Sequence, residues 1–138
     1  MEDAVPPVNP VEVVLQFEAR INSHSAEAVC DLLTADSVFI DSLGNKMQGT
    51  EKSRAGWVGY FKMVPDYLIS HTEIFGQGDT VAMFGMAQGT YSKDGHMVKE
   101  NFWKTPAAWR AVVRDDKIAV WQVFVDNEPI REVMRRGA

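Results

Sequence analysis

Apolar side chains recur every three or four residues in three stretches of the sequence, which is the spacing of an amphipathic helix. The first predicted helix spans residues 10–22, with Asn9 in position to cap its first turn. The second spans residues 26–34, close enough to the first to form a helical hairpin. Thr50 is in position to cap the third, which extends to about residue 63, and Pro65 stops its pattern because proline breaks helices.

The rest of the chain has the β-branched and aromatic runs that are typical of strands. A short strand is predicted first, and four longer strands follow, at residues 37–41, 67–75, 80–91, 97–114 and 117–126. Residues 76–79 and 93–95 are predicted hairpin turns. Pro106 lies within the third long run and indicates a bulge or an edge strand there. A short terminal helix is expected after Asn127.

This order of elements predicts an α+β fold. Long antiparallel hairpins twist and coil, so the sheet is expected to curve into a cone around three helices and to leave a hollow. The length of 138 residues fits one domain, predicted at residues 9–138. Residues 1–8 are expected to be a flexible tail, because Pro6 and Pro7 cannot lie inside a helix.

Composition narrows the function classes. A net charge of −5 argues against nucleic-acid binding, which needs a basic surface. The single cysteine, Cys30, excludes an internal disulfide, and no sequence motif indicates a metal or an organic cofactor. The sequence lacks a signal peptide and a membrane-spanning run, so we predict a cytoplasmic protein without membrane contact.

Three segments carry a resemblance to a known family. Residues 34–44, the Trp57 to Asp66 segment and residues 121–127 are similar to the nuclear transport factor 2-like superfamily, in its SnoaL-like and ketosteroid-isomerase-like branch. The resemblance covers about residues 9–134. It implies a cystatin-like α+β barrel, a small hydrophobic ligand and a homodimer formed through the sheet. The resemblance gives only weak information about the reaction, since one fold hosts many activities.

Asp41 is the leading candidate for chemistry. The resemblance places it where the isomerase has its general base, after a β-branched strand and before a turn that ends at Gly44. Strand alternation puts Phe39 and Asp41 on one face, so both face the hollow if either does. Desolvation there would raise the pKa of the carboxyl and make it a better base. The alternative is that Asp41 only closes its turn by hydrogen bonding.

The remaining candidates are expected to bind substrate. By the same resemblance, Phe17 and Trp109 stand where the isomerase has its oxyanion donors, but Phe17 cannot donate and Trp109 offers only an indole N–H. The full predicted set is aromatic, apolar or imidazole, and it comprises Phe17, Phe39, Trp57, Tyr60, Trp109, His71 and Met83. Met63, Met86, Trp103 and Trp121 could also wall a pocket, although core packing explains most such residues equally well. Asp126 is a second candidate acid or base, but a helix cap is favoured.

We therefore predict an isomerase or cyclase that uses Asp41 as general base on a hydrophobic carbonyl compound. The alternative is a non-catalytic ligand-binding or dimerisation module of the same fold. A dehydratase-type lyase is a third hypothesis, and it requires His71 or another histidine near Asp41.

Overall fold

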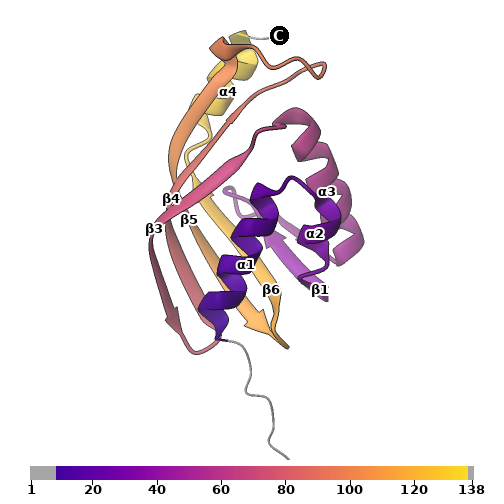
Figure 1. Cartoon of the computed structure of the whole chain (residues 1–138), viewed down its shortest axis with the longest axis vertical. Coiled ribbons are helices and arrows are strands. Elements are labelled where there is room, and N and C mark those ends of the chain that lie inside the picture. Colours follow the sequence, from indigo (N-terminus) through magenta and orange to yellow (C-terminus); the bar gives the residue numbers. More distant parts are fainter. Residues whose placement is uncertain (1–8, 137–138) are drawn as a thin grey trace, which may run out of the picture.

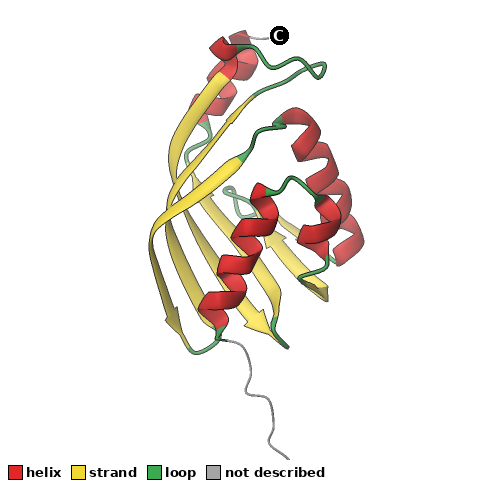
Figure 2. Cartoon of the chain, in the orientation of Figure 1, coloured by secondary structure: helices red, strands yellow, loops and turns green. Residues whose placement is uncertain are grey.

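The computed structural model describes residues 9–136, which form four α-helices, a short 3-10 helix and six strands (Figures 1 and 2). The elements in chain order are α1 (Pro10–Asn22), α2 (Ala26–Cys30), β1 (Leu33–Ile40), β2 (Lys46–Gln48), α3 (Thr50–Met63), β3 (Leu68–Gln77), β4 (Thr80–Thr90), η1 (Lys99–Asn101), β5 (Phe102–Arg114), β6 (Lys117–Val125) and α4 (Glu128–Arg136). The tail predicted at residues 1–8 lies outside the described residues. None of the described helices has the length and apolar character needed to span a bilayer.

The six strands form one curved sheet in the order β2-β1-β6-β5-β4-β3. Helices α1, α2 and α3 lie on its concave side, and α4 lies at the far end beside β5 (Figure 1). The α+β class and the helix-filled curved sheet are confirmed. The sheet is mixed, however, because β1 pairs in parallel with β6, and it is open, because β2 and β3 remain as separate edges. No hairpin joins β1 to β6, so nothing forced them to be antiparallel.

Several element boundaries differ from the prediction. Helix α2 ends at Cys30, four residues early, because Leu32 and Leu33 lead into β1 and the carbonyl of Leu32 accepts a hydrogen bond from Ile118 N at 2.8 Å. The tight hairpin expected at residues 93–95 is a longer connection that ends in η1. The register passes Pro106 without a bulge. At that residue only β4 is in register with β5, because pairing with β6 begins at Ala107, so Pro106 lies at a local edge.

The core lies between α1 and the inner face of the sheet. Asn9 caps α1 by accepting a hydrogen bond from Val11 N at 2.9 Å, as predicted. The apolar stripe of α1 is fully buried, and within it Phe17 meets Trp121 edge to face with ring centroids 4.7 Å apart. Met83 of β4 is equally buried. Burial of each such side chain contributes about 1.5–3 kcal/mol, so this layer anchors α1 to the sheet.

Helix α3 packs differently. Ser53 is its one buried residue, while Trp57 and Tyr60 on the sheet-facing side are only half-buried. Gly56 permits the close approach of Met47, since an added Cβ would lie 3.2 Å from the Met47 Cε atom. The aromatic side of α3 therefore faces a space between the helix and the sheet that the core does not fill.

Candidate functional site

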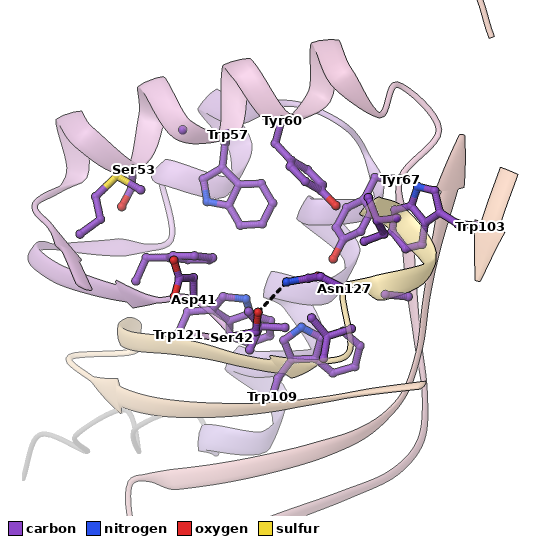
Figure 3. A pocket seen from close by; sticks show the side chains of 17 residues that line it. Asp41, Ser42, Ser53, Trp57, Tyr60, Tyr67, Trp103, Trp109, Trp121 and Asn127 are labelled. Carbon is purple, nitrogen blue, oxygen red and sulfur yellow. Dashed lines mark hydrogen bonds between the residues drawn. The ribbon is translucent and has the colours of Figure 1, made fainter. Parts of the chain in front are cut away.

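A cavity of about 260 Å³ lies between α3 and the inner face of the sheet (Figure 3). We call it the aromatic chamber. Its lining is mostly aromatic, with aliphatic and small polar residues at the ends, and comprises Phe39, Asp41, Ser42, Met47, Ser53, Gly56, Trp57, Tyr60, Tyr67, Ala87, Trp103, Trp109, Trp121, Val123, Val125, Asn127 and Ile130. It is larger than the cavity of ~150 Å³ that holds benzene. The chamber therefore has room for a molecule of about two fused rings.

Tryptophan dominates the walls, since all four tryptophans of the chain line the chamber. Trp109 of β5 and Trp121 of β6 stack with ring centroids 6.4 Å apart and an angle of 25°. They share the inner face because the register pairs Trp109 with Val123 and Ala111 with Trp121. Trp57 closes the opposite wall from α3. Flat polarisable walls favour a flat ligand, which can stack on them.

Asp41 lies at the end of β1 and begins the segment that we call the Asp41 turn, residues 41–45. Its Oδ1 accepts hydrogen bonds from the backbone N–H groups of Leu43 and Asn45, both at 2.9 Å. Its Oδ2 accepts one from Asn45 Nδ2 at 3.2 Å. Gly44 has a φ of 86°, a left-handed conformation that glycine adopts without strain. The turn predicted as the alternative role of Asp41 is therefore present, although Asp41 also lines the chamber.

The pKa of Asp41 is shifted downward, which is opposite to the expectation from the sequence. Desolvation raises it, but the hydrogen bonds from Asn45, Leu43 and Gly44 together outweigh that effect and hold the pKa below its ordinary value. Among residues 9–136, Asp41 is the one charged residue in the lining. The chamber thus contains a carboxylate that stays ionised and is a weaker base than the sequence argument assumed.

The segment after β6 closes the chamber beside the Asp41 turn. Asn127 Nδ2 donates a hydrogen bond to Ser42 Oγ at 2.6 Å, drawn as the dashed line in Figure 3. Asp126 accepts a hydrogen bond from Glu128 N at 2.9 Å through Oδ1, and it does not line the chamber. Asp126 thus binds the first N–H of α4, in keeping with the favoured helix-cap interpretation, although the residue directly before the helix is Asn127.

Tyr60 and Tyr67, which we call the tyrosine pair, line the chamber from α3 and from the start of β3. Their rings meet edge to face with centroids 4.8 Å apart. In Figure 3 both hydroxyls point into the chamber, and neither has a hydrogen-bond partner among residues 9–136. Burial raises the pKa of Tyr60 well above its ordinary value, and burial next to Tyr60 does the same for Tyr67. Both phenols are therefore protonated and able to donate.

Contacts to two other segments hold Tyr67 and its neighbour Asp66 in place. Asp66 accepts hydrogen bonds from the backbone N–H and the hydroxyl of Thr90, both at 2.7 Å. His24 Nε2 donates to the carbonyl of Tyr67 at 2.6 Å. The side chain of Tyr67 is only 8% exposed. A rigid backbone and tight packing hold its hydroxyl in one place.

Four predicted substrate-binding residues line the chamber: Phe39, Trp57, Tyr60 and Trp109. Phe17 and Met83 do not reach it, because they lie in the layer between α1 and the sheet. His71 is also outside, with Nδ1 2.8 Å from Glu18 Oε2 across the α1–β3 contact. The family resemblance suggested Phe17, and residue type suggested Met83 and His71, but the packing of α1 against the sheet holds all three outside the chamber.

The structure adds residues that the predicted set left out. Tyr67 was predicted only as the first residue of a strand, and in the structure it lies between the end of α3 and the first residue of β3. Ser42 and Asn127 lie in turns, where sequence assigns only local roles. Trp103 and Trp121 belonged to the wider group of wall candidates, and both line the chamber, whereas Met63 and Met86 do not. Within residues 9–136, no three His, Cys, Asp or Glu side chains gather into a set that could hold a metal.

Comparisons with known proteins identify the fold and the family. A proposed SnoaL-like polyketide cyclase from Shewanella denitrificans superposes with a TM-score of 0.78 at 16% identity, covering 92% of this chain and 97% of that one. IdmH, a proposed polyketide cyclase from Streptomyces antibioticus, gives 0.76 at 19% identity, covering 93% and 99%. A hypothetical protein with a ketosteroid isomerase-like fold from Catenulispora acidiphila, in complex with trimethylamine, gives 0.75 at 19% identity, covering 86% and 88%.

At these identities the superpositions show the fold alone. A search of the curated proteins finds no match. The sequence model of the SnoaL-like domain matches residues 14–121, which is most of the chain and includes α3, the tyrosine pair and the Asp41 turn. The protein therefore belongs to the SnoaL-like domain family, within the nuclear transport factor 2-like superfamily.

Proposed function

We propose that this protein binds a small, flat, mostly apolar carbonyl compound in the aromatic chamber and acts on it as an isomerase or cyclase. The observation that carries the proposal is the chamber itself, with four indole walls and a single carboxylate in its lining. The two similar structures described as proposed polyketide cyclases support the same class of substrate. The fold alone would not, since it serves several activities.

In this proposal Asp41 is the general base. A proton leaves the carbon next to the substrate carbonyl for Asp41 Oδ2, and the electron pair of the broken C–H bond enters the enolate. Oδ2 is the available oxygen, because it accepts one hydrogen bond of 3.2 Å whereas Oδ1 accepts two of 2.9 Å. Return of the proton to a different carbon gives isomerisation. Attack of the enolate carbon on a second carbonyl closes a ring, and the alkoxide formed there takes the proton back from Asp41.

The test uses 2-tetralone, a two-ring ketone, as a probe in heavy water. We expect the wild-type protein to exchange its α-protons for deuterium faster than buffer does, as followed by proton NMR. Asp41→Asn should reduce the exchange to the buffer rate while 2-tetralone still binds, because an amide keeps the turn but cannot take the proton. Asp79→Asn, an exposed turn residue outside the chamber, is the matched control. Exchange that survives Asp41→Asn refutes the base assignment.

A second candidate is a non-catalytic binding module, and one observation favours it. The Asp41 carboxylate is occupied by its own turn and its pKa is lowered, which makes it a poor base and a lasting negative charge. Aromatic rings around a negative charge suit an organic cation, held by cation–π attraction. The similar structure from Catenulispora acidiphila was in complex with trimethylamine.

A matched pair of probes separates these two candidates. Choline and 3,3-dimethylbutan-1-ol have the same shape, but only choline is charged. Quenching of tryptophan fluorescence by choline alone would favour the cation-binding module, since every tryptophan reports on the chamber. The dehydratase hypothesis required a histidine near Asp41. None of the three histidines, all of which lie within the described residues, lines the chamber, so the site does not favour that reaction.

We also propose that the outer face of the sheet forms a homodimer contact. Phe84 and Phe124 flank Ala108 across β4, β5 and β6, and Phe75 meets Phe84 with ring centroids 6.4 Å apart. These three phenylalanines are 44–59% exposed, and monomers rarely expose apolar patches of such extent. Phe84→Glu should give a monomer by sedimentation analysis, while Val58→Glu on α3 should not. A monomeric wild-type protein would refute the contact.

A further inference from the structure

The inner end of the chamber contains two hydroxyls that the proposed base chemistry does not use. A hydroxyl removed from water is costly unless it has a hydrogen-bond partner. Neither member of the tyrosine pair has one among the described residues, and Tyr67 is 8% exposed. Both line the cavity, and neither hydroxyl is fully closed off from it. Both donors are therefore accessible to an acceptor group on a ligand that enters the chamber.

We propose that Tyr60 and Tyr67 together form a site for one carbonyl oxygen, so that the chamber selects flat ketones over hydrocarbons of the same shape. The proposal rests on the proposed function, because it assumes that the chamber binds a small molecule. It goes further by naming the group that the ligand must carry and the end of the chamber at which that group lies.

The geometry matches a carbonyl. An sp² oxygen has two lone pairs and accepts two hydrogen bonds, and the tyrosine pair presents two hydroxyl donors on neighbouring rings that meet edge to face. In Figure 3 the two hydroxyls approach from α3 and from β3 and point into the same part of the chamber. A carbonyl cannot donate, so it uses both donors and leaves nothing of its own unsatisfied.

The electrostatics exclude the closest alternative. A carboxylate or phosphate would find no cation in the lining and one negative charge, Asp41. Two neutral donors do not replace a cationic partner for a full charge taken from water. A neutral carbonyl avoids that penalty, while the same two donors stabilise negative charge that develops on its oxygen later.

The donors are also held ready. Asp66 and His24 fix the backbone of Tyr67, and Tyr60 is packed between Trp57 and Tyr67 with edge-to-face contacts. Donors fixed before binding lose little entropy when a ligand arrives. With the oxygen at this end, the ring system extends along the indole walls toward Asp41, which lies across the chamber in Figure 3.

The first experiment compares 2-tetralone with tetralin, which has the same two rings and no carbonyl. Affinities are measured by tryptophan fluorescence and by calorimetry for the wild type, Tyr60→Phe, Tyr67→Phe and the double variant. We expect the wild type to prefer 2-tetralone at least tenfold, each single variant to reduce that preference about 3- to 10-fold, and the double variant to abolish it. Tyr91→Phe, the third tyrosine and not part of the lining, should leave it unchanged.

The second experiment observes the bound carbonyl group directly. The carbonyl stretching band of bound 2-tetralone, measured by infrared difference spectroscopy, should move to lower frequency than in hexane, and Tyr60→Phe should reverse part of the shift. An unshifted band in the wild type, or a double variant that keeps the preference, overturns the site. Equal binding of tetralin and 2-tetralone supports ligand binding in the chamber and refutes the tyrosine site alone. Failure of both probes to bind refutes the proposed function and this site with it.

Discussion

The two ends of the aromatic chamber treat their polar groups in opposite ways. At one end, the carboxylate of Asp41 receives three hydrogen bonds from residues two to four positions further along the chain. At the other end, the hydroxyls of Tyr60 and Tyr67 receive none from residues 9–136. The two ends also differ in burial, since the hydrogen bonds of Asp41 are exposed whereas Tyr67 is buried.

The local chain causes the difference in hydrogen bonding. A carboxylate at the start of a tight turn finds backbone N–H groups within its reach, and these stabilise its charged form. A phenol that projects from a helix or a strand finds none, because regular structure has already used the nearby N–H groups. Asp41 is therefore charged and partly satisfied, whereas the tyrosine pair is neutral and unsatisfied. A ligand therefore gains more from hydrogen bonds to the tyrosine pair than from hydrogen bonds to Asp41.

The largest expected effect is an alkaline loss of stability caused by the tyrosine pair. Burial raises the pKa of both phenols in the folded state, so above the ordinary tyrosine pKa of about 10 the unfolded chain releases protons that the folded chain keeps. The contribution of the phenols to stability is fully present below that pH. Above it, the free energy of unfolding falls by up to about 1.4 kcal/mol per pH unit for each phenol. Urea unfolding between pH 9 and about 12 should show this loss.

Replacing both tyrosines by phenylalanine should remove this loss of stability at alkaline pH, and each single replacement should remove about half of it. If the double variant loses stability as steeply as the wild type above about pH 10, the phenols are not shielded from solvent and the contrast between the two ends fails.

A smaller effect is expected from crowding the segment that carries Tyr67. Gly89 of β4 faces Val64 and Asp66, and an added Cβ would lie 2.2 Å from the Val64 Cγ1 atom. Valine has little rotamer freedom with which to move away, so Gly89→Ala should cost about 1–3 kcal/mol in urea unfolding. It should also weaken the preference for 2-tetralone, because Tyr67 moves with its segment.

The control is Gly59→Ala on α3, where nothing lies within 4 Å of the added atom. Alanine is the better helix former, so this variant should gain up to about 1 kcal/mol. Equal stability of the two variants would show that the tyrosine end tolerates rearrangement and is not held in one geometry.

Much of the fold could be predicted from residue patterns. Helical periodicity predicted both long helices, and Asn9 caps the first as expected, but Thr50, the expected cap of α3, is its first residue and Gly49 holds the cap position. The parallel pairing of β1 with β6 could not be predicted, because it joins segments about 80 residues apart and no turn sets its direction. The early end of α2 is a tertiary effect of the same pairing, through Leu32 and Ile118.

The site was less predictable, for a related reason. Strand alternation places Phe39 and Asp41 on one face, and both line the chamber. The pKa of Asp41 depends on the hydrogen bonds that Asn45 donates to it within the turn. Strand alternation does not describe those bonds. Tyr67 lies at a helix-to-strand junction, and its place in the chamber follows from Asp66 and Thr90 meeting across the sheet. Residue type suggests what can line a cavity, but contacts distant in sequence decide what does.

The smallest expected effect is an acid-dependent change at the Asp41 end. The lowered pKa of Asp41 means that the folded state favours the carboxylate, so its contribution is present above the ordinary aspartate pKa of about 4 and is lost as the pH falls through the lower folded value. An asparagine accepts the same backbone bonds more weakly. The wild type should exceed Asp41→Asn by about 0.5–1.5 kcal/mol at neutral pH, and the gap should close on acidification.

Urea unfolding of the two proteins from neutral pH down to about pH 2.5 measures this gap. Asp79→Asn is the control, because the Asp79 side chain makes no hydrogen bond or ion pair within residues 9–136. A gap that stays constant with pH would mean that the turn does not hold the charge of Asp41. The carboxylate would then be as unsatisfied as the tyrosine pair, the two ends of the chamber would be alike, and Asp41 would regain the basicity that the sequence argument assigned to it.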